Sequence, residues 1–230
     1  MNRDALKRAA ALRAIEEIED GMVLGLGSGS TAEFAVEALG KRVAQGLEIV
    51  AIPTSERTAA LARRLGVRIS SFAEHRRLDL TIDGADEVER GTLDLIKGKG
   101  GALLREKIVA AASARLVIVV DSGKLVDRLG ERSPVPVEVT AFGWQATAFA
   151  LEKLGSIPRL RTVASGEPFL TDGGNLILDC DFGPIDDAAA LEARIATTVG
   201  AIESGLFVGR TSAVVMASEE GVAMLKGGPA

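Results

Sequence analysis

The segment "LTIDGADEV", residues 80–88, ends an apolar run in three carboxylates. Asp83, Asp86 and Glu87 lie within five positions of one another, around Gly84. Acids in a polar turn often serve only solubility, but acids at the end of a buried strand can hold a polar ligand or move protons. The other motifs of the chain have to decide between these two interpretations.

A glycine-rich stretch, "GLGSGSTAEF" at residues 25–34, lies between an expected strand and an expected helix. Backbone N–H groups and the positive end of the helix would face one point there, which favours an anion. Ser28, Ser30 and Thr31 add hydroxyl donors, and Gly29 lets the backbone approach a phosphate closely. Taken alone, the stretch is equally consistent with a tight turn in which a hydroxyl only caps the helix.

Two common nucleotide motifs are absent from this stretch. Its glycines at 25, 27 and 29 follow G-x-G-x-G and not the dinucleotide pattern G-x-G-x-x-G, and Glu48, about twenty residues on, begins a strand instead of ending one. Ser30, and not a lysine, follows the last glycine, so the stretch is no P-loop. The pattern disfavours both NAD binding and nucleotide hydrolysis.

Residues 83–107 carry further charged groups at positions where they can converge. We expect Asp83 and Lys97 to end neighbouring strands of one parallel sheet, whose carboxyl edge forms a crevice. Glu106, one turn into the next helix, can aim back toward that edge, and Lys124 follows another strand. Each residue alone is more often a solvated surface charge. Together they predict a phosphate cradle beside a base and a cation, which suits proton transfer next to a carbonyl.

Strands and helices alternate through the first half of the chain, which is typical of a parallel sheet. We expect helices at 4–18, 31–44, 55–66 and 102–114, and strands at 22–27, 47–53, 78–83, 93–97 and 115–121. The fold class is therefore α/β, a doubly wound, mostly parallel, Rossmann-like sheet, with a smaller α+β second domain. Pro134 and Pro136 suggest a boundary, so residues 1–131 plus 206–230 form the first domain and 132–205 the second. We expect residues 205–218 to return and pair with the first sheet.

Composition excludes several classes of function. The 230 residues carry 27 basic and 32 acidic side chains, a net charge of −5, so neither nucleic acid nor a membrane is an expected partner. The single cysteine, Cys180, allows no intrachain disulfide, and the single histidine, His75, allows no histidine metal cluster or triad. We interpret Cys180 as core filler and His75 as exposed. The N-terminus lacks a signal-like apolar run, so we expect a cytoplasmic protein with a small-molecule substrate.

Four motifs in this order resemble one known family. "GLGSGSTA", "DGADE", "KGKGGALLREK" and the later "DSGK" are similar to those of ribose-5-phosphate isomerases of the A type. The resemblance also covers the N-terminal helix, "SPVPVEV", "TDGGNLILD" and "GLFVGR", and so spans nearly the whole chain. It implies interconversion of ribose 5-phosphate and ribulose 5-phosphate through an enediol in the pentose phosphate pathway. It also implies that no metal or organic cofactor takes part and that the protein is a homodimer or homotetramer.

The resemblance also implies roles for individual residues. Glu106 would move the proton between C2 and C1, Lys97 would stabilise the oxyanion, and Asp83 and Asp86 would serve the sugar hydroxyls and ring opening. The substrate-binding residues it implies are Ser28, Gly29, Ser30, Thr31, Gly84, Ala85, Gly98, Lys99, Gly100 and Lys124, with Lys7 a weaker candidate.

Two positions depart from the family pattern. Lys99 interrupts three consecutive glycines, and Leu104 replaces a common threonine, but neither change removes a catalytic group. The alternatives are another sugar-phosphate isomerase, a coenzyme A transferase-like enzyme, or a phosphosugar-binding sensor. "DGADE" argues against the first two, and the lack of a DNA-binding extension argues against the sensor.

Overall fold

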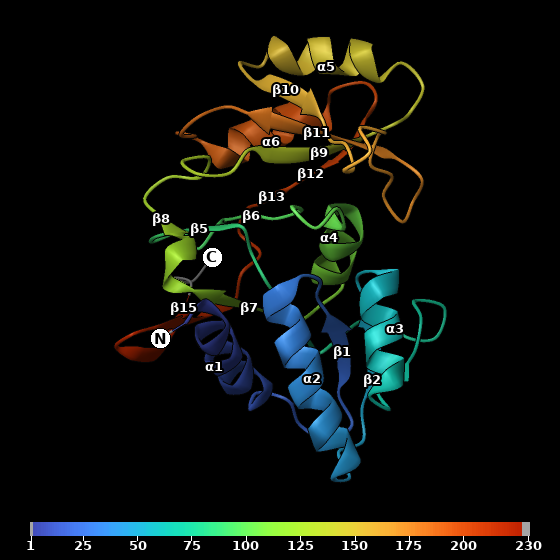
Figure 1. Cartoon of the computed structure of the whole chain (residues 1–230), viewed down its shortest axis with the longest axis vertical. Coiled ribbons are helices and arrows are strands. Elements are labelled where there is room, and N and C mark those ends of the chain that lie inside the picture. The colour runs from blue at the N-terminus through green and yellow to red at the C-terminus, as the bar shows by residue number, and fades with distance from the viewer. Residues whose placement is uncertain (1, 227–230) are drawn as a thin grey trace. The chain divides into compact units, whose positions relative to one another are not determined.

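The computed structural model describes residues 2–226, which form two compact units (Figure 1). Unit 1 contains residues 2–85, 105–124 and 210–226, and unit 2 contains residues 86–104 and 125–209. This division differs from the expected one, because residues 86–104 and 125–131 belong to unit 2. Their short strands pair with one another and with a strand that follows residue 205.

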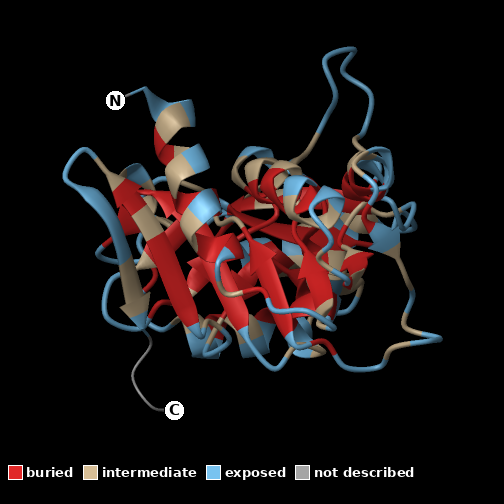
Figure 2. Cartoon of the chain, turned by 90° about the horizontal axis from the view of Figure 1, so that it is seen from below, coloured by how far each residue is buried: buried red, intermediate tan, exposed pale blue. Residues whose placement is uncertain are grey.

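Unit 1 is built on a seven-stranded sheet in the order β15-β14-β7-β4-β1-β2-β3. All neighbouring strands are parallel except β15, which runs antiparallel to β14. Buried residues, red in Figure 2, concentrate in the strands. The strands are β1 (Val23–Leu26), β2 (Val50–Pro53), β3 (Arg68–Ile69), β4 (Leu80–Asp83), β7 (Leu116–Asp121), β14 (Ala213–Ser218) and β15 (Gly221–Lys226). The expected Rossmann-like sheet is confirmed.

Helices cover both faces of this sheet. Leu24 and Leu26 pack in one apolar cluster with side chains of α1 (Arg3–Ile15), α2 (Ser30–Ala44) and α3 (Glu56–Arg64), while Val23 packs near Val109 of α4 (Leu103–Ala111). Alternate residues of a strand point to opposite faces, so α4 lies on the face opposite the other three helices. A β-carbon on Gly25 would collide with Val109, which explains a glycine in the middle of a buried strand.

The helix starts follow local capping chemistry. Ser55 caps α3 as expected, because its hydroxyl accepts from the N–H of Thr58 at 3.1 Å. Asp4 does not cap α1. Asn2 does, through a 2.8 Å bond from the N–H of Ala5, and Asp4 lies inside the first turn. Gly29 precedes α2 at φ +94°, a left-handed value that favours glycine.

Unit 2 contains two four-stranded sheets. One is antiparallel, in the order β10-β11-β9-β12, and the other has the order β13-β6-β5-β8. The first has β9 (Val135–Val139), β10 (Ile157–Leu160), β11 (Leu176–Asp181) and β12 (Ala201–Ser204), with α5 (Trp144–Glu152) and α6 (Ala188–Ala196). The second has β5 (Glu87–Glu89), β6 (Leu95–Ile96), β8 (Leu125–Val126) and β13 (Leu206–Phe207). Unit 2 is thus a smaller α+β unit, as expected.

Pro134 and Pro136 do not mark a domain boundary. Pro136 lies in β9, an inner strand that is buried along its whole length. Proline normally argues against an inner strand because it lacks an N–H donor. Here its carbonyl still accepts a 2.7 Å bond from the N–H of Gly205, and its neighbours in β9 supply the rest of the pairing.

The placement expected for Lys97 is wrong. The short strand before it, β6, does not belong to the parallel sheet but runs antiparallel to β5 and β13 in unit 2. The expected return of 205–218 is confirmed only for β14, which pairs in parallel with β7. None of the described helices combines the length and apolar character that crossing a membrane requires.

Candidate active site

The glycine-rich turn between β1 and α2 is shaped by close contacts to β4. A β-carbon on Gly27 would overlap the carboxylate of Asp83, so only glycine fits there. The backbone N–H of Gly27 donates to the carbonyl of Ile82 at 2.9 Å. These contacts hold the turn directly against the end of β4.

Asp83 fastens two loops with one carboxylate oxygen. Oδ1 accepts hydrogen bonds from the N–H of Ser28 at 3.1 Å and from the N–H of Gly84 at 2.7 Å. The side chain is 1% exposed. Backbone N–H donors are strong partners for a buried carboxylate, so Asp83 sets the positions of both the glycine-rich turn and the start of the "GADE" segment.

The Ser28 hydroxyl belongs to a cluster that was not anticipated. It lies 2.7 Å from the hydroxyl of Thr54, donates to Ser55 at 2.8 Å and lies 3.2 Å from that of Thr58. The Thr58 hydroxyl in turn donates to the carbonyl of Gly27 at 3.1 Å. The cluster ties the turn to the start of α3, so the Ser28 side chain stabilises the turn itself.

The start of α2 carries the features of an anion site. The ammonium of Lys7 donates to the hydroxyl of Ser30 at 3.0 Å and lies 3.3 Å from Asp4. Ser30 is exposed and Thr31 is half-buried, both in the first turn of α2. A lysine ammonium at a helix N-terminus adds positive charge where the backbone N–H groups already attract an anion.

Two further predicted residues lie in unit 1. Glu106 is in the first turn of α4 and is 4% exposed. Lys124 ends a short 3₁₀ turn, η1 (Ser122–Lys124), after β7. Buried Asp121 holds this turn by accepting from the N–H of Gly123 at 3.1 Å, and Arg3 lies 3.4 Å from the same carboxylate. Asp121 is therefore structural.

The remaining predicted residues lie in unit 2. Asp86 accepts from the N–H of Lys99 at 2.9 Å, so the acid and the lysine loop are brought together. Lys97 is 2% exposed, its N–H donates to the carbonyl of Gly205 at 2.9 Å, and its ammonium lies 5.5 Å from the centre of the Phe207 ring. Such a ring face stabilises a cation.

Glu87 is not a solvated turn acid, which was one of the two interpretations of the acids in this motif. It is 1% exposed and accepts from the N–H groups of Gly130 and Arg132, each at 2.7 Å, and of Ser133 at 2.5 Å. Its role is to fasten the 130–133 loop. The three acids of the opening motif thus have separate partners. Asp83 holds the glycine-rich turn, Asp86 the lysine loop and Glu87 the 130–133 loop.

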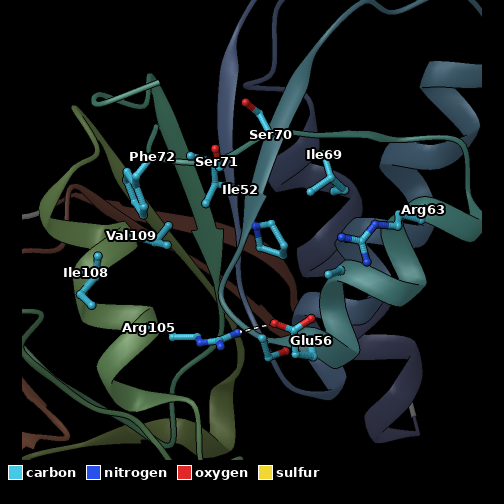
Figure 3. Close-up of a pocket in the computed structure, with 13 residues that line it drawn as sticks. Ile52, Glu56, Arg63, Ile69, Ser70, Ser71, Phe72, Arg105, Ile108 and Val109 are labelled. Carbon is cyan, nitrogen blue, oxygen red and sulfur yellow. Dashed lines mark hydrogen bonds and ion pairs between the residues drawn. The ribbon is translucent and has the colours of Figure 1, made fainter. Parts of the chain in front are cut away.

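Other candidate features add no catalytic group. His75 is half-buried and not exposed, and Cys180 is fully buried as expected. Among the described residues, no group of three or more His, Cys, Asp and Glu side chains could hold a metal ion. Unit 1 also contains a cavity of about 330 Å³, with the Arg105–Glu56 ion pair at 2.9 Å on its wall. Figure 3 shows the side chains that line it. It is lined by none of the predicted site residues.

Comparison with known proteins shows which family this chain is similar to. The model of the family "Ribose 5-phosphate isomerase A (phosphoriboisomerase A)" matches residues 50–221. A ribose-5-phosphate isomerase A from Gloeobacter violaceus is 61% identical over 98% of this chain and 97% of its own length. One from Gluconobacter oxydans is 52% identical over 94% of each chain.

Solved structures agree over nearly the whole chain. A D-ribose-5-phosphate isomerase in complex with phospho-erythronic acid has a TM-score of 0.95 at 38% identity, covering 98% of this chain and all of that one. The ribose 5-phosphate isomerase A of Methanocaldococcus jannaschii has a TM-score of 0.93 at 39% identity, covering 97% and 99%. The matches extend through both units, and the chain belongs to the ribose-5-phosphate isomerase A family.

Proposed function

We propose that the protein interconverts D-ribose 5-phosphate and D-ribulose 5-phosphate through an enediolate, as an aldose–ketose isomerase of the pentose phosphate pathway. Membership of the isomerase family supports this reaction. The observation that carries it is the pairing of an anion site at the start of α2 with the buried carboxylate of Asp83, fastened to the same turn. A sugar phosphate needs both a phosphate site and acids for its hydroxyl groups.

The phosphate is proposed to bind at the start of α2. Gly29, Ser30 and Thr31 offer backbone N–H groups and two hydroxyls, and Lys7 brings a cation to the Ser30 hydroxyl. Ser28 contributes by keeping the turn in shape, because its hydroxyl is already engaged with the Thr54–Ser55–Thr58 cluster. The other proposed substrate-binding residues are Gly84, Ala85, Gly98, Lys99, Gly100 and Lys124.

The chemistry is proposed to begin with ring opening by the acids Asp83 and Asp86. Glu106 then takes the proton from C2, and the electrons of the broken C–H bond form the enediolate. Lys97 stabilises the negative oxygen that develops at C1. A proton is exchanged between the two oxygens, and Glu106 returns its proton to C1 to give the ketose, so atoms and charge balance without a redox partner.

The test is an isomerase assay on the purified protein. Ribose 5-phosphate should be converted, while arabinose 5-phosphate and glucosamine 6-phosphate should react far more slowly. In heavy water, deuterium should enter the product at the carbon that receives the proton. Binding of ribose 5-phosphate without turnover would identify a sensor and contradict the proposal.

We also propose a cytoplasmic homo-oligomer, a dimer or tetramer. Most of the exposed large apolar side chains among the described residues lie in unit 2, including Phe142 at 97% and Val199 at 91% exposure. Exposed apolar surface of this kind is typical of an interface between subunits. Light scattering at micromolar concentration should give a multiple of the 23.9 kDa chain mass, and a monomer would contradict the proposal.

A further inference from the structure

We propose that Arg161, held by Asp179, is a positioning residue that fixes the Lys97–Gly101 loop in its working conformation. The inference rests on the proposed function for its kinetic consequences, because Lys97 and Asp86 belong to the proposed catalytic set. All the residues concerned lie in unit 2. None of the sequence motifs pointed to Arg161.

Arg161 binds the backbone of the loop at two consecutive carbonyls. Its Nη1 donates to the carbonyl of Gly98 at 2.9 Å and to that of Lys99 at 3.1 Å. The Gly98 carbonyl also accepts from the N–H of Gly101 at 2.9 Å, so both of its lone pairs are used. The guanidinium therefore supports the turn that the loop makes between Lys97 and α4.

The loop needs this support because its backbone is unusual. Gly98 has φ +100° and Gly101 has φ +81°, both left-handed values that favour glycine. Because glycine adopts many other backbone conformations as readily, the glycines alone do not fix the conformation of the loop. The ring of Phe169 packs directly against Gly101, since a β-carbon on Gly101 would overlap that ring. The centre of that ring lies 5.9 Å from the Arg161 guanidinium carbon. Arg161 and Phe169 together enclose the glycine turn.

Asp179 fixes Arg161 in a two-point pair. Nε of Arg161 donates to Oδ2 at 2.9 Å, and Nη2 contacts Oδ1. Asp179 lies in β11, between β10 and β9, with its neighbour Cys180 fully buried, so the pair stands on a rigid strand. The backbone N–H of Arg161 also donates to the carbonyl of Ile177 at 2.9 Å.

The role of this pair is geometric. Asp179 neutralises Arg161, so the pair brings no net charge to the loop, and only a planar fork can grip a carboxylate and two carbonyls at once. Two backbone donors of the loop are also bound: the N–H of Lys97 donates to the carbonyl of Gly205, and the N–H of Lys99 donates to Asp86. Arg161 thus holds the middle of the segment that carries Lys97 and meets Asp86.

The experiment compares Arg161→Met and Arg161→Lys with Arg159→Met. The side chain of Arg159, two residues earlier, is exposed and makes no hydrogen bond or ion pair among the described residues, so Arg159 is a matched control. A misplacement of about 1 Å can cost roughly 100-fold in rate. We expect kcat of Arg161→Met to fall by about that factor. KM should rise less, because the loop carries the proposed substrate-binding residues Gly98, Lys99 and Gly100, while the proposed phosphate site is in unit 1. Arg161→Lys should recover only a small part of the lost kcat, and the kcat of Arg159→Met should match that of wild type.

Hydrogen exchange of the loop amides gives a readout that does not depend on catalysis. Arg161→Met should speed exchange at Lys99 and Gly101, and leave exchange in β9 and β11 unchanged. Unchanged exchange in the loop, or an Arg161→Lys protein with wild-type kcat, would overturn the proposal. If wild type proved inactive on ribose 5-phosphate while the exchange result held, the proposed function would fail and the positioning role would stand. Should Arg161→Met not fold, Asp179→Asn, which keeps the shape but weakens the pair, should show the same changes to a smaller degree.

Discussion

The carboxylate of Asp83 occupies the space that a side chain on Gly27 would need. The same carboxylate accepts from the N–H groups of Ser28 and Gly84. The missing side chain at position 27 is therefore what allows one acid to fasten both the glycine-rich turn and the loop after β4.

Gly27→Ala should damage both stability and activity. The new methyl group also meets the backbone of Asp83, so β1 and β4 must move apart, and overpacking of this kind costs about 1–3 kcal/mol. Gly21→Ala is the reference, because position 21 has φ +80° but open space, so only backbone strain is added. Urea unfolding midpoints and turnover should both be lower for Gly27→Ala than for the reference. Equal midpoints and equal turnover for the two variants would contradict the close contact between position 27 and Asp83.

Glu106→Gln should keep the fold and lose most turnover, because the amide keeps the shape but cannot accept a proton. A positioned general base is worth about 10²–10⁴-fold in rate. Deuterium uptake from heavy water should slow by the same factor. Glu16→Gln, at an exposed position in α1's C-terminal cap, is the matched control and should behave as wild type. Near wild-type isomerisation by Glu106→Gln would require another base, with Asp83 the first candidate.

Lys97→Met should lower kcat more than it raises KM, since the ammonium is proposed to act on charge that exists only after proton removal. Loss of one oxyanion donor costs roughly 3–4 kcal/mol, or 10²–10³ in kcat. Lys153→Met is the control, because that lysine also lies over a ring, Phe149 at 4.3 Å, but is exposed. An unchanged kcat for Lys97→Met would remove Lys97 from the mechanism.

Thr31→Ala should mainly raise KM, because a phosphate donor acts equally in the ground state and the transition state. We expect kcat to stay within a few-fold of wild type. Lys7→Met should show the same pattern with a larger effect, since it removes a charge next to the Ser30 hydroxyl. Wild-type KM values for both variants would show that the phosphate binds elsewhere.

Burial raises the pKa of the Cys180 thiol to about 12. In the unfolded chain the thiol titrates near 8.5, so between that pH and about 12 the unfolded state loses a proton that the native state keeps. Stability should therefore fall as the pH rises through this window. Unfolding free energies at pH 8 and pH 10 should show a larger drop for wild type than for Cys180→Ala. Thiol reagents should label the native protein only through unfolding.

Local patterns in the sequence were sufficient for much of unit 1. Apolar runs and helical spacing predicted most elements of its parallel sheet, because burial on both faces leaves continuous Val, Ile and Leu runs such as β7. Short strands were missed. β5 and β8 have three and two residues, and strands of that length carry no periodicity. The inner strand β9 was missed because the prolines in and beside it were interpreted as the end of regular secondary structure.

The sequence by itself identified the family, since residue type and order do so without any coordinates, and the chemistry proposed for residues 25–31, 83–86, 97–100, 106 and 124 follows from those motifs. Only the tertiary structure decided which partner each group has. β6 reads as a strand, but the sheet it joins depends on pairing with β13, more than a hundred residues later. Likewise Arg161 is an ordinary arginine in the sequence, and it acquires a role because folding brings its guanidinium to Asp179 and to the carbonyls of Gly98 and Lys99. Such contacts depend on long-range packing, which no local pattern encodes.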